Sequence, residues 1–240
     1  MKTLNTLFAS VLVAATTTAY AQTSVTIITT TTDSVKTETS KPAPKKVERV
    51  VSDFSIYVGF NNLSGSLPAG YELRPIGSRF VALAWQKRIP LVTGGSTKLR
   101  LITGPEVAWN NFMFDGRNVL TRQNDKLVIE AAPTDLHKSK LVTTQLNLPL
   151  MLNVAAKSGF SFSVGAYAGM RLDSYTSVKA VGARTVRDHN SYNLSPVRWG
   201  FMTEMGFKGS ARLFGRYEPN SLFRAGQGPD ASVWSVGIKL

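Results

Sequence analysis

Cysteine is absent from this 240-residue chain, which excludes a disulfide framework, thiolate catalysis and cysteine metal sites. Beyond the N-terminus no stretch approaches the ~18 uninterrupted apolar residues of a membrane-spanning helix, so the sequence predicts none. Acidic residues number 15 against 28 lysines and arginines, a net charge of +13. Such a charge predicts nucleic-acid binding only with a basic patch and a reader motif. Neither is present, so we expect no nucleic-acid partner.

The N-terminus has the pattern of an exported protein. Residues 1–21, "MKTLNTLFASVLVAATTTAYA", combine an early lysine, a short apolar run and a small-residue cleavage site, which predicts a signal peptide. A membrane anchor is the alternative, but the apolar run is short for one. Residues 22–52 are rich in Thr and then in Lys and Pro, which is typical of a disordered linker, here a periplasmic one. Asp33-Ser34-Val35 within it resembles a short O-glycosylation motif.

From residue 53 to residue 240 apolar and polar residues alternate with the period of two that indicates β-strands. Short and long connections also alternate along the chain. This combination predicts an all-β fold, an eight-stranded antiparallel transmembrane β-barrel with short periplasmic turns and long extracellular loops. An even number of strands would place both ends of the barrel in the periplasm. The expected strands are 53–61, 79–87, 98–110, 140–154, 159–173, 197–207, 211–218 and 231–240.

The alternation alone does not say which face is outside, since a soluble barrel or sandwich would turn its apolar face inward. Charged residues in mid-strand, mixed with glycines, favour a narrow filled lumen. We predict a salt-bridged plug in which Glu204 faces Arg212 and Arg216, and Glu218 lies beside Arg198. Replacing both Arg212 and Arg216 by alanine should then destabilise the barrel or open a leak. The predicted lumen network is Arg100, Glu106, Arg171, Arg198, Glu204, Arg212, Arg216 and Glu218.

Aromatic residues of the apolar face gather near the strand ends, which favours two interfacial girdles over a sandwich core. The turn-end girdle is predicted to contain Phe54, Trp85, Phe160 and Phe207. The loop-end girdle is predicted to contain Phe60, Trp109, Trp199 and Trp234.

The final strand alternates up to the last residue. Trp234, Val236, Ile238 and Leu240 share its apolar face. Because lipid tolerates no open sheet edge, we expect this terminal strand to pair with the first strand and close the barrel.

Several stretches resemble a known family: "EVAWNNFMFD", "KSKLVTTQLNLPLMLNV", "LFGRYEPNSLFRAGQGPD" and "SVWSVGIKL". They are similar to the PorT-like outer-membrane β-barrel domain of the Bacteroidetes. The resemblance implies an eight-stranded barrel in the outer membrane of a Gram-negative cell, inserted by the barrel-assembly machinery. Leu240 stands where the assembly signal more often has an aromatic residue. Pro149 lies inside an expected strand, so we expect a bulge or a lost hydrogen bond there.

Catalytic chemistry has little support. His137 lies near Asp135 and His189 beside Asp188, both in expected extracellular loops. An outer-rim hydrolase would need such a pair to converge with a nucleophile, and no catalytic, nucleotide or calcium motif is present. We therefore expect no enzyme and no metal or other cofactor.

The leading prediction is a structural or interaction protein with a plugged lumen and binding capacity in its extracellular loops. Its expected partners are outer-membrane lipids, lipopolysaccharide phosphates contacted by loop lysines and arginines, and an unknown protein. Two alternatives stay open. One is a narrow porin-like pore, which would be mildly anion-selective because more basic than acidic residues are predicted to point inward. The predicted inward basic residues are Arg100, Arg171, Arg198, Arg212, Arg216 and Lys239, and the acidic ones are Glu106, Asp173, Glu204 and Glu218. The other is an accessory component of a protein secretion system.

Overall fold

The structure is a computed structural model that describes residues 49–92, 96–123 and 126–240. The predicted signal peptide and nearly all of the predicted linker lie outside the described residues. The linker was predicted to reach residue 52, but the first strand already begins at Val51. Among the described residues, no helix is long and apolar enough to cross a membrane.

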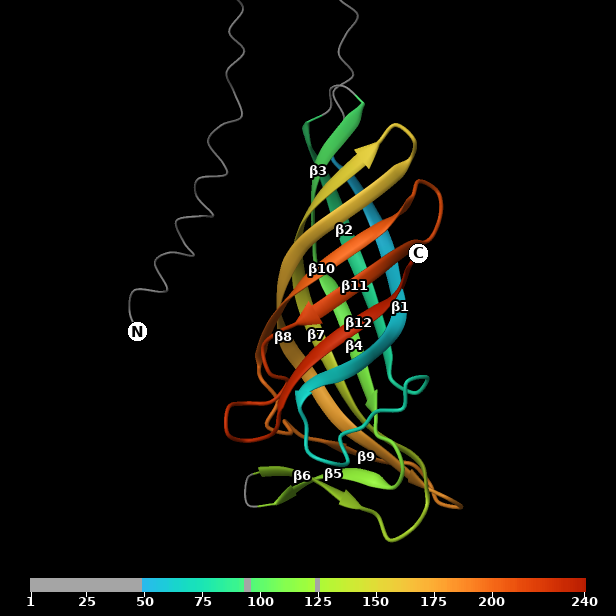
Figure 1. Ribbon diagram of the computed structural model, residues 1–240, viewed down its shortest axis with the longest axis vertical. Coiled ribbons are helices and arrows are strands. Elements are labelled where there is room, and N and C mark those ends of the chain that lie inside the picture. The colour runs from blue at the N-terminus through green and yellow to red at the C-terminus, as the bar shows by residue number, and fades with distance from the viewer. Residues whose placement is uncertain (1–48, 93–95, 124–125) are drawn as a thin grey trace, which may run out of the picture. The chain divides into compact units, whose positions relative to one another are not determined.

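Twelve β-strands make up the described chain, all paired antiparallel (Figure 1). The strands are β1 (Val51–Ser66), β2 (Arg79–Val92), β3 (Thr97–Thr103), β4 (Glu106–Met113), β5 (Asn118–Gln123), β6 (Lys126–Ala131), β7 (Leu136–Ala156), β8 (Phe160–Ala180), β9 (Val186–His189), β10 (Val197–Phe207), β11 (Arg212–Glu218) and β12 (Asp230–Lys239).

Ten of the strands form one sheet that closes on itself, and β5 pairs only with β6. Strands β3 and β4 lie end to end between β2 and β7, while β9 is an appendage of β8. Eight positions therefore remain around the ring, in agreement with the predicted strand count. Every neighbouring pair is hydrogen-bonded, so the ring presents no unpaired edge within the described residues.

The last strand closes the ring, as predicted. Strand β12 pairs with β1 from Ser66 opposite Asp230 to Tyr57 opposite Lys239. The ladder continues one residue further, because the Leu240 N–H donates to the Ile56 carbonyl at 2.8 Å. A return bond from the Ile56 N–H to the Leu240 carbonyl measures 3.2 Å. The seam is thus paired through the final residue.

A single predicted strand, 98–110, is interrupted in the structure at Gly104-Pro105. Gly104 has φ +142°, and a Cβ there would lie 2.0 Å from the Trp85 carbonyl oxygen. Only glycine fits this backbone without strain. The register against β2 is the same on both sides, with Thr103 opposite Lys87 and Glu106 opposite Ala84. The inward and outward faces therefore keep their phase across the break.

Of the two disturbances expected at Pro149, a bulge or a lost hydrogen bond, the bulge is not found. Pro149 lies opposite Tyr167 with no shift of register, although proline supplies no N–H to the ladder. The register of β7 against β8 shifts instead between Thr144 and Gln145, where Asp173 and Arg171 are the successive partners. The bulge prediction was therefore wrong in its position.

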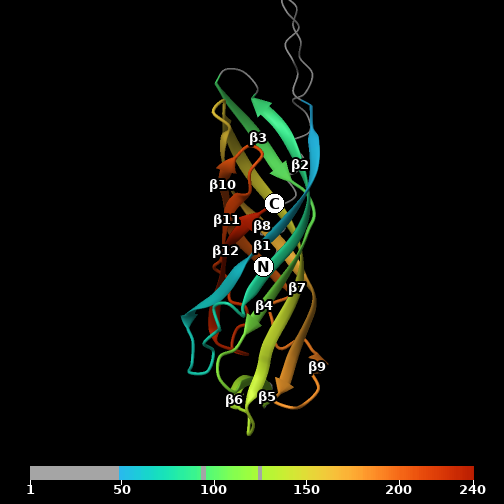
Figure 2. The same ribbon diagram turned by 90° about the vertical axis from the view of Figure 1, so that its right-hand side faces the viewer.

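The long connections contain structure that the alternation did not predict. The 111–139 loop carries the β5–β6 hairpin, and the 174–196 loop carries β9. Strands β7 and β8 also run well beyond the predicted 140–154 and 159–173. Figures 1 and 2 show β5, β6 and β9 together at one end of the ring, opposite the short turn between β7 and β8. We name these the loop end and the turn end.

The two faces of the ring point as predicted, with the apolar face outward. On β1, Phe54 and Phe60 are 60% and 50% exposed, whereas Ser55 and Tyr57 between them are buried. The same alternation holds on β7, where Leu150 is 57% exposed and Met151 is fully buried. Charged residues of β10, β11 and β12 are buried inside the ring. A water-soluble fold would reverse this arrangement.

Candidate functional site

The centre of the lumen is held by an ion pair between β4 and β11. The Arg216 guanidinium donates to both carboxylate oxygens of Glu106, at 2.6 and 2.5 Å. Asn147 Nδ2 donates to the same carboxylate at 2.9 Å. The guanidinium also lies over the rings of Phe80 and Tyr57, at 4.8 and 5.0 Å from their centroids. Both Nη groups of Arg216 and both oxygens of Glu106 are therefore engaged, as a buried ion pair requires, whereas Arg216 Nε has no hydrogen-bond partner among the described residues.

A second group of polar residues lies on the turn-end side of this pair. Lys239 Nζ donates to Glu204 Oε2 and to Gln86 Oε1, each at 2.7 Å. The Tyr57 hydroxyl donates to Glu204 Oε1 at 2.5 Å and accepts from Gln86 Nε2 at 2.7 Å. These four residues form a closed cycle across β1, β2, β10 and β12. All four are buried.

A third ion pair joins β10 to β11, between Arg198 and Glu218. The Tyr167 hydroxyl donates to Glu218 Oε1 at 2.7 Å. Tyr167 also lies under the Arg216 guanidinium, at 5.2 Å from the ring centroid. Through Tyr167 and Tyr57 the three ion pairs are in contact with one another. We call the connected set of Tyr57, Gln86, Glu106, Asn147, Tyr167, Arg198, Glu204, Arg216, Glu218 and Lys239 the lumen network.

The predicted pairings are partly present. Arg198 meets Glu218 as expected, but Glu204 pairs with Lys239 and not with Arg212 or Arg216. Phe214 lies directly opposite Glu204 in the ladder. Arg216 reaches across the lumen to Glu106 instead. Strand alternation placed these side chains inside the ring, but it could not say which ones meet across it.

Three residues of the predicted network lie outside it. Arg100 and Arg212 line a cavity at the turn end. Arg171 lies toward the loop end, where its Nη1 donates to Ser174 Oγ at 2.7 Å. Asp173, also expected to point inward, is 48% exposed and meets His189 Nδ1 at 3.3 Å. The bulge at Leu172 shifts the phase of β8, so that Ser174 and Thr176 are the next buried positions.

Tyr57, Gln86, Asn147 and Tyr167 are network members that the charge pattern did not select. Each has the inward phase of its strand and each is buried. A search of the inward positions for hydrogen-bonding side chains, and not for charges alone, would have found them.

The predicted aromatic residues lie on the outer face. At the turn end Phe54 is opposite Trp85 in the β1–β2 ladder, and the Phe160 and Phe207 rings meet at 5.5 Å. Of the residues assigned to the loop-end girdle, Phe60, Trp199 and Trp234 are 50%, 46% and 37% exposed, and Trp109 is half-buried. All eight project away from the lumen, on the same phase as the apolar strand residues.

The loop end is covered by an apolar cluster to which the β5–β6 hairpin contributes. Tyr71 packs edge-on against Phe114 and Phe223, each at 6.3 Å between ring centroids. Burial raises the pKa of Tyr71 to about 12. We call this cluster the loop-end cap; it contains Leu63, Tyr71, Leu73, Phe112, Phe114, Leu120, Leu127, Leu141, Tyr192, Leu194, Leu222, Phe223, Ala231 and Val233.

Tyr192 joins the cap to the rim. Its hydroxyl donates to Asp188 Oδ2 at 2.8 Å and lies 2.9 Å from Thr176 Oγ1. Burial is the main cause that raises the pKa of Tyr192 to about 12. Tyr192 and Asn193 both have positive φ, at 47° and 50°, so the chain turns sharply where it enters the cap.

The two histidines do not form a catalytic arrangement with the neighbours predicted for them. Asp188 accepts from Tyr192, and His189 turns to Asp173 and stacks on Tyr175 at 5.0 Å. Asp135, expected near His137, lies 4.0 Å from Arg117. No group of three potential metal ligands occurs in the part of the chain that the structure describes. The absence of enzymatic activity and of a cofactor remains a prediction.

Comparison with known proteins adds little to this geometry. No family model and no curated protein matches the chain. Among solved structures, one match is Ail, the attachment invasion locus protein of Yersinia pestis. It is 12% identical, covers 81% of this chain and 100% of its own, and superposes with a TM-score of 0.35. A similarity this low carries no argument about function, and the resemblance to the PorT-like family remains a prediction.

Proposed function

We propose that this chain is an outer-membrane β-barrel protein with a plugged lumen, acting as a structural or interaction protein through its loop end. The observation that carries the proposal is that the apolar face of the sheet points outward and the charged face points into the ring, the reverse of a water-soluble fold. Leucine, valine and aromatic side chains project outward from all around the ring, while six charged residues of the lumen network are buried within it. Exposed apolar surface of this extent favours a lipid neighbour, because soluble monomers rarely carry it.

Closure of the ring supports the same proposal. A membrane offers no water to unpaired backbone groups, so only helices and closed sheets cross it. Here the seam between β1 and β12 is paired through Leu240. The outer membrane is the expected location, since the predicted signal peptide and the PorT-like stretches both point to export in a Gram-negative cell. The barrel-assembly machinery is then the expected partner in insertion.

The plug favours an interaction role over transport. The lumen network crosses the ring with no unpaired carboxylate at Glu106 or Glu204, and the loop-end cap covers one mouth. Binding would therefore occur on the outer side of the cap, where β5, β6 and β9 lie. Exposed cations at this end can bind the phosphates of lipopolysaccharide. One of them is Arg187, whose Cζ lies 5.7 Å from the centroid of the Tyr175 ring. An unknown protein partner at this end is the second possibility for the same surface.

A pair of matched substitutions tests the membrane assignment. Leu150→Arg changes a residue in the middle of β7 that is 57% exposed, and Val186→Arg changes one on β9 that is 67% exposed. In lipid vesicles we expect Leu150→Arg to lower the free energy of unfolding by about 2–4 kcal/mol, because arginine near the bilayer midplane is costly. We expect Val186→Arg to change it by about 0–1 kcal/mol. Urea titration of vesicle-refolded protein, followed by tryptophan fluorescence, measures both.

The comparison is informative because the two side chains have similar exposed fractions, 57% and 67%. If both side chains faced water, both substitutions would be nearly neutral. Equal, small effects in vesicles would therefore overturn the membrane assignment.

A further inference from the structure

A cavity of about 340 Å³ opens at the turn end of the ring, on the opposite side of the lumen network from the cap. Its lining contains seven lysine or arginine residues and, among the described residues, no aspartate or glutamate. These cations come from β2, β3 and β11, from the β7–β8 and β10–β11 turns, and from the segment before β1. No residue of the loop end takes part, so this cavity is separate from the surface proposed above.

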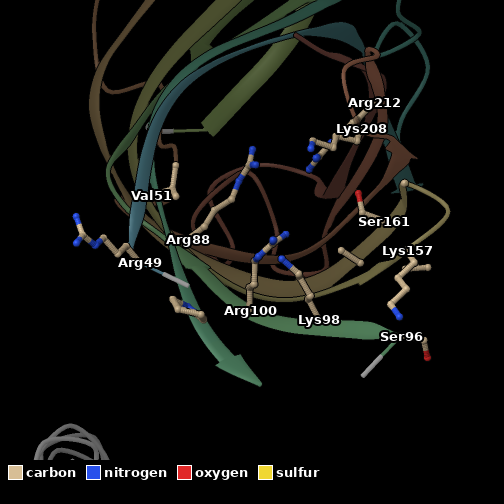
Figure 3. A pocket seen from close by; sticks show the side chains of 14 residues that line it. Arg49, Val51, Arg88, Ser96, Lys98, Arg100, Lys157, Ser161, Lys208 and Arg212 are labelled. Carbon is tan, nitrogen blue, oxygen red and sulfur yellow. The ribbon is translucent and has the colours of Figure 1, made fainter. Parts of the chain in front are cut away.

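The cations converge on one space. Figure 3 shows Arg88, Lys98 and Arg100 on one wall and Lys208 and Arg212 on the facing wall, with their nitrogens directed between the walls. Arg49 and Lys157 lie at the rim. Among the described residues, the Asp53 carboxylate contacts one of these cations, with Oδ2 at 2.5 Å from Arg88 Nη2.

The lumen network closes the inner side of the cavity. Arg212 lies opposite Lys239 in the β11–β12 ladder, and Gln86 precedes Arg88 by one inward position on β2. Arg88 and Arg212 repel one another, and both repel Lys239. The carboxylate of Glu204 is already engaged by Lys239 and Tyr57. The cavity is therefore closed at its inner end and has an excess of positive charge. The surrounding protein walls strengthen the positive electrostatic potential inside it.

We propose that this turn-end cavity binds phosphate groups, carried by a small soluble phosphorylated compound or by a lipid headgroup. The planar guanidinium group of arginine can donate two parallel hydrogen bonds to the oxygens of one phosphate, and lysine side chains add positive charges around it. The volume lies near the lower limit of small-molecule sites, so it admits a compact anion and excludes a folded partner. The site requires only the closed ring and is independent of the membrane assignment.

The binding experiment uses the full chain, refolded in a maltoside detergent that contains no phosphate. Inorganic pyrophosphate is titrated calorimetrically at low ionic strength. We expect saturable binding that weakens as salt is added. In the double variant Arg88→Gln/Arg212→Gln the affinity should fall at least about tenfold, the loss of one charge-assisted contact or more. The matched control is Arg74→Gln/Arg79→Gln, which removes the same charge at the loop end, outside both the cavity and the surface formed by β5, β6 and β9, and should leave the affinity unchanged.

Two further measurements keep the proposal falsifiable if the double variant folds poorly. The variant Arg88→Lys/Arg212→Lys preserves the positive charge but removes the guanidinium groups that donate paired hydrogen bonds, and it should retain part of the affinity for pyrophosphate. In the unmodified protein, pyrophosphate should protect Lys208 from an amine-reactive reagent and leave Lys138, at the loop end, unprotected. Absence of binding at low salt, equal loss in the loop-end control, or unprotected Lys208 would each overturn the proposal.

A second arm distinguishes the two sources of phosphate. The same protein is titrated with a short-chain phosphatidic acid and with its phosphatidylcholine analogue. Binding of pyrophosphate alone supports a soluble ligand. Binding of the phosphatidic acid that is competed by pyrophosphate and weakened by Arg88→Gln/Arg212→Gln supports a lipid headgroup at this site. Equal binding of both lipids, without competition by pyrophosphate, would show that they contact the apolar outer face of the ring and would count against the cavity as a lipid site.

Discussion

Arg216 is the residue on which the interior of the ring depends most. Its guanidinium binds Glu106 through two hydrogen bonds and lies against the rings of Phe80, Tyr57 and Tyr167. Both partners of the ion pair are almost completely inaccessible to solvent, at 3% and 1% of their side-chain surface. Burying two charges is costly, and the cost is recovered only while each has its partner.

We expect Arg216→Ala to lower the free energy of unfolding by about 3–5 kcal/mol, because it leaves the Glu106 carboxylate buried without a counter-charge. Arg212→Ala should have a much smaller effect, since Arg212 lines the turn-end cavity and has no carboxylate to leave behind in the lumen network. Most of the effect foreseen for replacing both arginines should therefore come from Arg216. Urea unfolding of the refolded protein compares the two single variants.

The double variant Arg216→Met/Glu106→Gln provides the control for this prediction. Removing both charges and keeping most of the volume should restore much of the stability lost in Arg216→Ala. If Arg212→Ala proved as damaging as Arg216→Ala, the assignment of the central ion pair would be wrong.

At the scale of elements, closure of the ring depends on how closely β1 and β12 approach. Gly59 lies opposite Gly237 in their ladder. A Cβ on Gly237 would lie 2.2 Å from the Val58 carbonyl oxygen and 2.4 Å from the Gly59 Cα. Both obstacles are backbone atoms, which cannot move aside as a side chain does. The two glycines allow the first and last strands to meet.

We expect Gly237→Ala to separate β1 from β12 and to weaken the seam. The folded fraction after refolding should fall, seen as loss of the fast-migrating band in unheated gel samples. Gly215→Ala on the neighbouring strand β11 is the matched control, because its Cβ would meet only Thr203 Cγ2, at 3.4 Å. Equal refolding of the two variants would contradict the importance of the close approach at the seam.

At the scale of the whole molecule, the lumen network and the loop-end cap lie in series along the ring. The network is continuous from Gln86 through Tyr57 and Arg216 to Glu218, and the cap fills the next layer with apolar side chains. A solute passing through the ring would have to break ion pairs and then unpack the cap. Either barrier alone is large relative to thermal energy.

We therefore expect no steady unit conductance from the folded protein in a planar lipid bilayer. The gel shift between unheated and boiled samples confirms folding before the measurement. The variant Glu106→Ala/Arg216→Ala, which opens the centre of the network, should show flickering leak currents and demonstrates that insertion was achieved. Steady conductance from the unmodified protein would favour the pore alternative and contradict the plug.

Sequence alternation by itself determined the number of positions around the ring and which residues share a face of each strand, and the charges and glycines of the polar face predicted that this face points inward. This works because successive side chains of a strand point to opposite sides, so an observed Leu-x-Leu pattern fixes both the element and its faces. The pairing of β12 with β1 followed from the same pattern and from the rule that lipid tolerates no open edge. These inferences used only local information and a general physical constraint.

Only the tertiary structure decided which inward residues meet. Glu106 and Arg216 are 110 positions apart in the chain, and they touch because β4 and β11 face one another across a closed ring. Strand pattern carries no information about distances across the lumen, so Glu204 was assigned the wrong partner and the turn-end cavity was not foreseen. The loop segments β5, β6 and β9 were missed for a related reason: they are ordered by packing against the cap and the extended β8, which no local pattern describes.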